Sequence, residues 1–147
     1  MMHQLIHVFV YGTLRPGNPN HGLISEAVAS AVDAVVEGLQ LLVPSHGAFP
    51  YACPLEGSRT RGTLLAIRPE QWPTARRRLD RLEGYDESSD TGHYLRRQLQ
   101  VRTDRGDVAA WVYLAGPRTP VQTMSPVPGN EWPTPTPTRA RQYRLTH

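Results

Sequence analysis

The feature that most constrains the fold of this 147-residue chain is an early apolar run that ends at a glycine turn. Residues 5–11 read Leu-Ile-His-Val-Phe-Val-Tyr, and this β-branched and aromatic pattern is typical of a buried strand. Gly12 and Gly17 occur in the residues that follow. Backbone N–H groups freed where a strand ends can point together at an anion or a developing oxyanion. The sequence therefore predicts a strand followed directly by a loop that can bind an anion.

The order of the remaining predicted elements indicates an α+β fold. It is strand, helix, three strands, helix and two strands, which is not a regular βαβ series. We therefore expect a small mixed, mostly antiparallel sheet that can close into a barrel flanked by helices. The expected segments are a helix over 22–31, a bent strand over 32–43, a turn-rich stretch over 44–58, a strand over 61–67, a helix from Pro69 to Gly84, and strands over 94–103 and 108–114 joined by a turn.

The helix that ends at Gly84 places Glu83 in an unusual position. A negative charge in the last turn opposes the helix macrodipole and costs ~0.3–1 kcal/mol. This field, together with flanking apolar residues, would raise the pKa of the carboxyl above its ordinary value of about 4.3. A general base at neutral pH needs such a carboxylate. The alternative is a solvated Glu83 paired with an arginine such as Arg78. The predicted apolar stripe of this helix consists of Trp72, Ala75, Leu79 and Leu82.

Neighbouring acids are weaker candidates for a base. Asp80 points about 60° away from Glu83 on a helical wheel, so we expect it to pair with an arginine. Asp86, Glu87 and Asp90 fall in a polar loop and are expected to be solvated. Glu83 is the acid that the pattern favours.

Composition argues against several other classes of protein. The net charge is +3, and all 16 basic residues are arginine, mixed along the chain with acids. A nucleic-acid binder more often separates its basic face from acids, so we expect no nucleic-acid partner. No apolar stretch approaches the roughly 18–20 residues of a membrane span, and the first four residues do not resemble a signal peptide. Cys53 is the only cysteine, which fits a structural thiol in a reducing compartment. We therefore expect a cytoplasmic protein without a membrane partner.

Common cofactor and catalytic motifs do not occur in this sequence. It contains no Gly-x-Gly-x-x-Gly, no glycine-rich phosphate loop ending in lysine and no Gly-x-Ser-x-Gly. Six scattered histidines lack the spacing of a metal site. We expect neither a cofactor nor a metal ion.

The early loop and the Glu83 segment together resemble the γ-glutamylcyclotransferase-like superfamily, and most of all its γ-glutamylamine cyclotransferase branch. The resemblance rests on Tyr11-Gly12-Thr13-Leu14, extended by Arg15 to His21, and on Leu79 to Tyr85. Weaker similarities follow in the same order along residues 5–132. They are Gly38-Leu39, Phe49-Pro50, Gly62-Thr63-Leu64, Tyr94-x-Arg96, Trp111-x-Tyr113 and Gly129-Asn130-Glu131-Trp132, the last with Asn-Glu where the family usually has Asp.

The resemblance implies a barrel with a cavity between the loop and the helix end. Tyr11, Gly12, Thr13 and Leu14 would bind a γ-glutamyl substrate, and Glu83 would be the proton acceptor. The substrate's α-amine would attack its own γ-carbonyl and release 5-oxoproline and an amine, without metal or cofactor. The ordinary pKa values of glutamate and an α-amine differ by ~3.5, or roughly 5 kcal/mol, so a dry pocket and a largely buried Glu83 are expected.

The sequence leaves three points open. The leaving amine could belong to an amino acid, an ε-lysine isopeptide, glutathione or a γ-glutamyl-capped biosynthetic intermediate. The scaffold could also bind γ-glutamyl compounds without turnover, or the arginines could serve a polyanion adaptor. For domain organisation we expect a core over 1–123 and a Pro/Thr-rich extension over 124–147, whose first part, to about residue 132, packs on the core.

Overall fold

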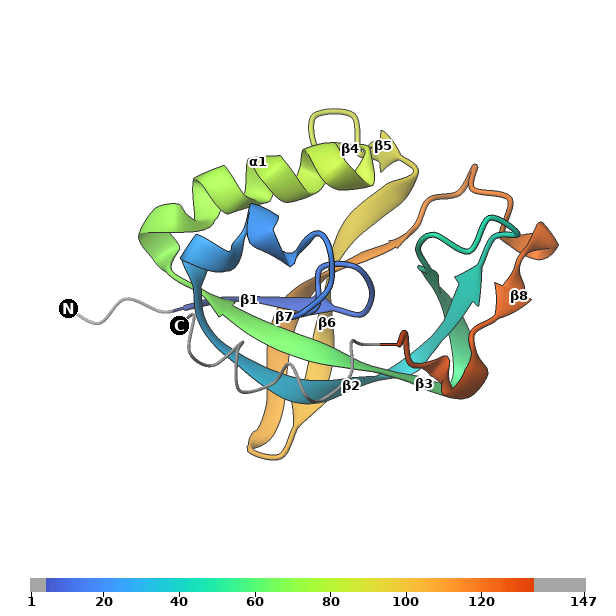
Figure 1. Cartoon of the computed structure of the whole chain (residues 1–147), viewed down its shortest axis with the longest axis horizontal. Helices are drawn as coiled ribbons and strands as arrows, with labels where there is room; N and C mark the ends of the chain where they lie inside the picture. Colours follow the sequence, from blue (N-terminus) through green and yellow to red (C-terminus); the bar gives the residue numbers. More distant parts are fainter. Residues whose placement is uncertain (1–4, 134–147) are drawn as a thin grey trace.

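The computed structural model describes residues 5–133 of the chain. Within this range, six strands form the main sheet and two short strands form a separate pair (Figure 1). The strands are β1 (Ile6–Val10), β2 (Val28–Val43), β3 (Tyr51–Ile67), β4 (Tyr85–Asp86), β5 (Thr91–Gly92), β6 (Tyr94–Thr103), β7 (Gly106–Ala115) and β8 (Ser125–Pro126). The helix is α1 (Trp72–Glu83), and the 3-10 turns are η1 (His21–Leu23), η2 (Ser25–Ala27), η3 (Pro69–Gln71), η4 (Val121–Thr123) and η5 (Pro128–Asn130).

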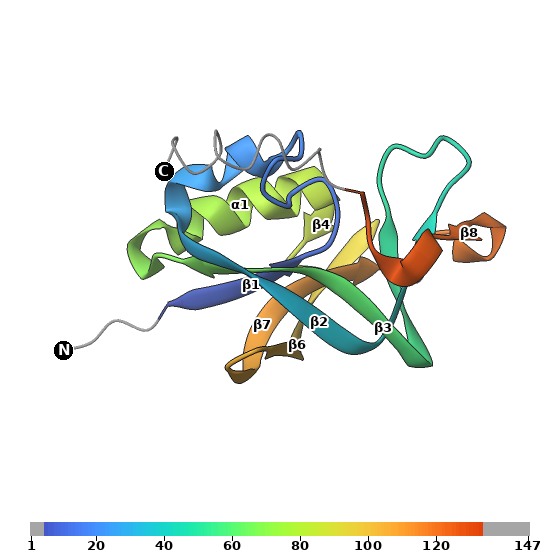
Figure 2. The same ribbon diagram turned by 60° about the horizontal axis from the view of Figure 1, so that its bottom comes forward.

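The strand pairings run in a circle. β1 pairs antiparallel with β3 and parallel with β7, β7 pairs with β6, β6 with β2, and β2 with β3. Two of these links, β1–β7 and β2–β6, are each a single residue pair. The sheet is therefore strongly curled, and α1 lies across one side of it (Figures 1 and 2). The predicted fold class, α+β with a mixed and mostly antiparallel sheet, is confirmed.

Both faces of β1 are buried, which explains why its sequence is apolar throughout. Val8 and Val10 belong to a core cluster that contains Leu79 of α1. Phe9 and Tyr11 belong to a second cluster that contains Leu41 of β2. Successive side chains of a strand point to opposite faces, so one strand supplies both clusters. The predicted strand over residues 5–11 is confirmed, with Ile6–Val10 as its paired part.

The long β2–β3 hairpin accounts for two sequence predictions that were wrong. The predicted helix over 22–31 is replaced by η1 and η2, and Val28 already pairs with Ile67 of β3. A helix of ten residues is marginal alone, and sheet pairing outcompetes it. The turn-rich stretch predicted over 44–58 is also too long, because β3 begins at Tyr51.

A bulge allows β3 to extend through residues that look like a turn. Leu39 pairs with Pro54 and Glu37 pairs with Arg59, so residues 55–58 loop out opposite Gly38. Gly38 has a φ of 82°, a conformation that favours glycine. The bent strand predicted over 32–43 thus lies within β2, with its bulge at Gly38.

Two further predictions hold closely. The helix that follows Pro69 ends at Gly84, whose φ of 66° places it in the left-handed region typical of a helix C-cap. Along its stripe, Ala75 and Leu79 are buried, Trp72 packs against the core, and Leu82 is exposed. The hairpin of β6 and β7 turns at Asp104 and Arg105, so β7 begins two residues earlier than expected.

The chain beyond residue 123 returns to the sheet before the described range ends. Ser125 and Pro126 pair with the end of β2, and Val127 is buried. Residues 134–147, the larger part of the predicted extension, lie outside the described residues. No helix in the described part of the chain is long and apolar enough to span a membrane.

Candidate functional site

A cavity of about 250 Å³ lies between the loop after β1 and the C-terminal end of α1. It brings together the five residues that the sequence singled out, Tyr11, Gly12, Thr13, Leu14 and Glu83, although about 70 positions separate the loop from the glutamate. The other lining residues are Phe9, Val10, Asn20, Phe49, Pro50, Tyr51, Leu82, Gly84, His93, Tyr94 and Tyr113.

The loop after β1 is fixed through its carbonyl groups. The Thr13 carbonyl accepts the Asn20 N–H, and the Asn20 side-chain amide donates to the Thr13 hydroxyl, both at 2.9 Å. The Leu14 carbonyl lies 2.8 Å from Nδ1 of buried His21, which therefore donates. The Gly12 carbonyl accepts the Arg15 N–H at 3.0 Å. Within residues 5–133, by contrast, the N–H groups of Gly12, Thr13 and Leu14 donate to no other group. The loop thus keeps backbone donors available beside the cavity.

Gly12 is required by close packing. A Cβ atom at this position would lie 2.9 Å from Cγ and Cδ of Pro50, which is closer than van der Waals contact. Pro50 is buried and lines the cavity just before β3 begins. The absence of a side chain at Gly12 therefore lets the β1 loop and the start of β3 form one wall.

Glu83 has an electrostatic environment that favours its protonated form. Burial raises its pKa from 4.5 to about 8. Its exposed fraction is intermediate rather than negligible, because it lines an open pocket. In the described part of the chain it has no hydrogen bond or ion pair. Arg78, the partner in the alternative interpretation, instead donates to the Leu23 carbonyl at 3.0 Å. The predicted rise in pKa is thus present, with desolvation as its cause.

The other carboxylate on this part of α1 is fully engaged. Asp80 accepts two hydrogen bonds from Arg96, at 3.1 and 3.3 Å, and one from the Tyr113 hydroxyl at 2.5 Å. The Arg96 guanidinium also lies 5.3 Å from the Tyr85 ring centroid and 5.0 Å from that of Trp111. The prediction that Asp80 pairs with an arginine is confirmed.

The acids after α1 are exposed but not unpaired. Glu87 lies 3.0 Å from Arg96, Asp90 lies 2.8 Å from Arg97, and Asp86 accepts hydrogen bonds from Ser88. These contacts hold their pKa values below the ordinary range, for Glu87 through the hydrogen bond from Arg96, and for Asp86 and Asp90 through those from Ser88 and Arg97. None of the three lines the cavity.

Sequence reasoning assigned Tyr11 to the substrate-binding loop but gave no such role to Tyr94 and Tyr113. Tyr11 donates to the carbonyl of Tyr113 and accepts the Ala52 N–H at 3.3 Å. Tyr94 donates to the Pro50 carbonyl at 2.8 Å and stacks on Tyr51 at 4.4 Å between ring centroids. Burial raises the pKa of all four, so they are neutral at physiological pH. Tyr94 and Tyr113 did appear in motifs that resemble the family, and that was the available signal.

A buried arginine connects the loop to the end of the described chain. Arg15 donates to the Thr63 hydroxyl at 3.1 Å, to the Trp132 carbonyl at 3.3 Å and to Glu131 at 3.5 Å. Glu131 and Trp132 belong to the late motif in which this sequence departs from the family pattern. The structure shows that this motif braces the residue directly after Leu14.

Cys53 and the histidines take no part in the cavity's inner wall. Cys53 is buried, and burial raises the pKa of its thiol, as expected for a structural cysteine. His93 lines the cavity but is exposed. Among residues 5–133, no three His, Cys, Asp or Glu side chains are grouped so that they could hold a metal ion.

Comparison with known proteins identifies the family. A family model described as gamma-glutamyl cyclotransferase, AIG2-like, matches residues 8–134. The chain belongs to this family. Membership in the gamma-glutamyl cyclotransferase family supports cyclotransferase activity in general terms and a small γ-glutamyl molecule as the class of substrate.

Individual relatives agree with this membership in sequence and in fold. Gamma-L-glutamyl-butirosin B gamma-glutamyl cyclotransferase of Niallia circulans is 29% identical over 142 residues, which cover 96% of this chain and 79% of the relative. An AIG2-like protein from Mus musculus superimposes with a TM-score of 0.70 at 23% identity, covering 92% and 93% of the two chains. A gamma-glutamyl cyclotransferase specific to glutathione from yeast gives 0.54 at 14% identity, covering 81% and 72%. The two structures show the shared fold of the cyclotransferase family.

Proposed function

We propose that this member of the cyclotransferase family converts a γ-glutamyl amine or amide into 5-oxoproline and a free amine, with Glu83 as general base and acid. The observation that carries the proposal is that Glu83 lines the same cavity as Gly12, Thr13 and Leu14, whose N–H groups donate to no other group within residues 5–133. A base and a set of anion-binding donors are the two components that the reaction requires.

The raised pKa of Glu83 fits a proton transfer with an α-amine. A pKa of about 8 lies close to the ordinary α-amine value of about 7.7–8.0. The roughly 5 kcal/mol mismatch expected for a solvated glutamate is thereby removed. The ionised carboxylate accepts a proton from the substrate's α-ammonium group, and the amine then attacks the γ-carbonyl carbon. As the lactam C–N bond forms, the attacking nitrogen gives up a second proton. As the original amide C–N bond breaks, Glu83 delivers both protons in turn to the leaving nitrogen, which departs as an ammonium ion.

The loop would stabilise the negative charge of the substrate or of the tetrahedral intermediate. Each backbone N–H group that binds an oxyanion typically lowers the activation barrier by ~3 kcal/mol.

The four cavity tyrosines remain neutral and present apolar ring faces, which keep water away from the reacting groups. Because the nucleophile and the carbonyl belong to one molecule, the cavity accelerates the reaction by holding the chain curled.

The decisive experiment is mass-spectrometric detection of 5-oxoproline across a panel of γ-glutamyl amines and amides. Glu83→Gln should lower kcat roughly 10²–10⁴-fold while circular dichroism stays unchanged. Glu70→Gln is the matched control, since Glu70 is an exposed acid in η3, the turn that precedes α1, and should leave turnover at the wild-type level.

Two outcomes would contradict parts of this proposal. Full activity in Glu83→Gln would remove Glu83 as the base. A folded wild-type protein that binds γ-glutamyl compounds but releases no 5-oxoproline from any of them would support the alternative, a non-catalytic binder on the same scaffold.

A further inference from the structure

The cavity has a buried inner wall and an apolar rim. Tyr11, Tyr94 and Tyr113 of the inner wall are 3–7% exposed. Phe49, in the loop between β2 and β3, and Leu82, in the last turn of α1, each retain 38% exposure. They are two of the six large hydrophobic side chains exposed in the described range, and both line this cavity. The rim therefore offers apolar surface that a bound molecule could cover.

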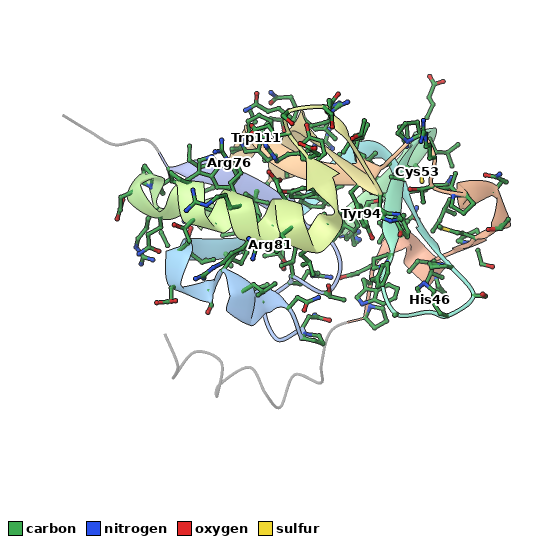
Figure 3. All side chains as sticks on the ribbon, turned by 90° about the horizontal axis from the view of Figure 1, so that it is seen from above. His46, Cys53, Arg76, Arg81, Tyr94 and Trp111 are labelled. Carbon is green, nitrogen blue, oxygen red and sulfur yellow. The ribbon has the colours of Figure 1, made fainter. Side chains whose placement is uncertain are left out.

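A series of aromatic rings continues from the inner wall to this rim. Tyr94 stacks on Tyr51 at 4.4 Å, Tyr51 lies 5.8 Å from Phe49, and Phe49 lies 5.0 Å from His46. Figure 3 shows Tyr94 beside the C-terminal end of α1 and His46 out in the β2–β3 loop. These separations are those of interacting aromatic pairs. A further ring held at the rim would extend the same series.

The cavity lining offers little to balance a charge. Among the described residues that line it, Glu83 is the only carboxylate, exposed His93 is the only histidine, and there is no arginine or lysine. A carboxylate on the leaving amine would meet no guanidinium or ammonium group, and a second ammonium group would meet only the carboxylate that the reaction already uses. Covering a charged group without a partner is unfavourable.

We propose that the preferred substrate carries an uncharged aromatic or arylalkyl amine as its leaving group, with the ring against Phe49 and Leu82. This inference rests on the proposed function, because it assumes that the γ-glutamyl group occupies the inner half of the cavity beside Glu83. The amide C–N bond to the arylalkyl nitrogen breaks, the lactam C–N bond forms, and two protons of the α-ammonium group pass to the arylalkyl nitrogen. The products are 5-oxoproline and the arylalkylammonium ion.

The test compares kcat/KM for four synthetic amides that share the γ-glutamyl group. They are the methylamide, the benzylamide, the cationic 5-aminopentylamide and the anionic γ-glutamylglycine. The benzylamide should exceed the methylamide by roughly 10- to 100-fold, and neither charged amide should exceed the methylamide. Phe49→Ala should lower the benzylamide-to-methylamide ratio about tenfold. Leu55→Ala, at a residue 44% exposed on β3 and away from the cavity, should preserve the ratio.

The outcomes separate this inference from the proposed function. Release of 5-oxoproline from all four amides without a preference for the benzylamide overturns the leaving-group assignment and leaves the cyclotransferase activity intact. The same holds for a benzylamide preference that Phe49→Ala does not reduce. No 5-oxoproline from any amide overturns both. The ratios of the wild-type protein decide the matter even if a variant fails to fold.

Discussion

Asp80 and Glu83 lie one helical turn apart on α1, yet their surroundings are opposite. Asp80 is held by Arg96 and by the Tyr113 hydroxyl, with its side chain only 14% exposed. Glu83 faces the cavity without an ionic or hydrogen-bonded partner in the described structure, and its pKa is raised to about 8. Both carboxylates lie where β6 and β7 meet the helix. The packing that gives Asp80 its hydrogen-bond partners leaves Glu83 without one.

The difference separates the structural role of Asp80 from the chemical role proposed for Glu83. A carboxylate that accepts hydrogen bonds from an arginine is stabilised in its charged form and anchors the elements that it joins. A carboxylate in an apolar wall is destabilised in its charged form and becomes a stronger base. The Asp80 contacts fix α1 against the sheet, and this attachment holds Glu83 in place over the cavity.

The largest expected effect of breaking this arrangement is on stability, through Asp80. Asp80→Ala leaves Arg96 buried without its main partner, which should lower the free energy of unfolding by about 3–5 kcal/mol. Urea denaturation followed by circular dichroism measures the loss. Asp90→Ala breaks the exposed pair with Arg97, which solvent screens, and should cost far less than the loss of Asp80. Equal losses in the two variants would mean that the Asp80 cluster is not the anchor.

The second effect is a pH-dependent gain in stability on removing the Glu83 charge. Because its folded pKa is about 8 and its ordinary value 4.5, the folded state binds one more proton between these values. Wild-type stability should therefore fall as pH rises through this window, by roughly 1.4 kcal/mol per pH unit at most, and then level off. Glu83→Gln should lack this slope and be more stable than wild type at pH 8. Parallel stability–pH curves for the two proteins would contradict the buried-base description.

The pH dependence of activity tests the same group in the opposite direction. The proposed base must be ionised before it can accept the proton, so kcat/KM should rise about tenfold per pH unit up to about pH 8. The 5-oxoproline assay gives this profile with a buffer series of constant ionic strength. If kcat/KM stopped rising near pH 4.5, the base would be a solvated carboxylate, and Glu83 would have the ordinary pKa of an exposed acid.

The smallest expected effect concerns the cap that separates Glu83 from the following strand. Gly84 has a φ of 66°, so Gly84→Ala should cost about 1–2 kcal/mol of stability. Its Cβ would lie 3.3 Å from Cδ2 of His93, which can move. Gly22→Ala is the control, because a Cβ there meets no atom within 4 Å. Thermal unfolding of both variants distinguishes a required left-handed cap from an incidental glycine.

Local sequence patterns predicted the elements whose structure depends on neighbouring residues. The strand before Gly12, the helix between Pro69 and Gly84 and the β6–β7 hairpin follow from apolar runs and turn residues that act over a few positions. The same patterns were wrong for residues 22–31 and 51–58. There, pairing between β2 and β3 over long sequence distances overrides local preference.

For the candidate site, the sequence by itself determined which groups are proposed to carry the chemistry. The unusual carboxylate at the end of the helix and the glycine loop after the first strand were both visible in it, and the loop's motif pointed to the family that the comparisons then established. It could not show that Pro50 and Tyr94 form the walls between them, because only folding brings the segment before β3 and strand β6 together. The tertiary structure also decided which carboxylate remains unpaired, since the position of Arg96 in space, rather than in the chain, engages Asp80 and leaves Glu83 to the apolar cavity.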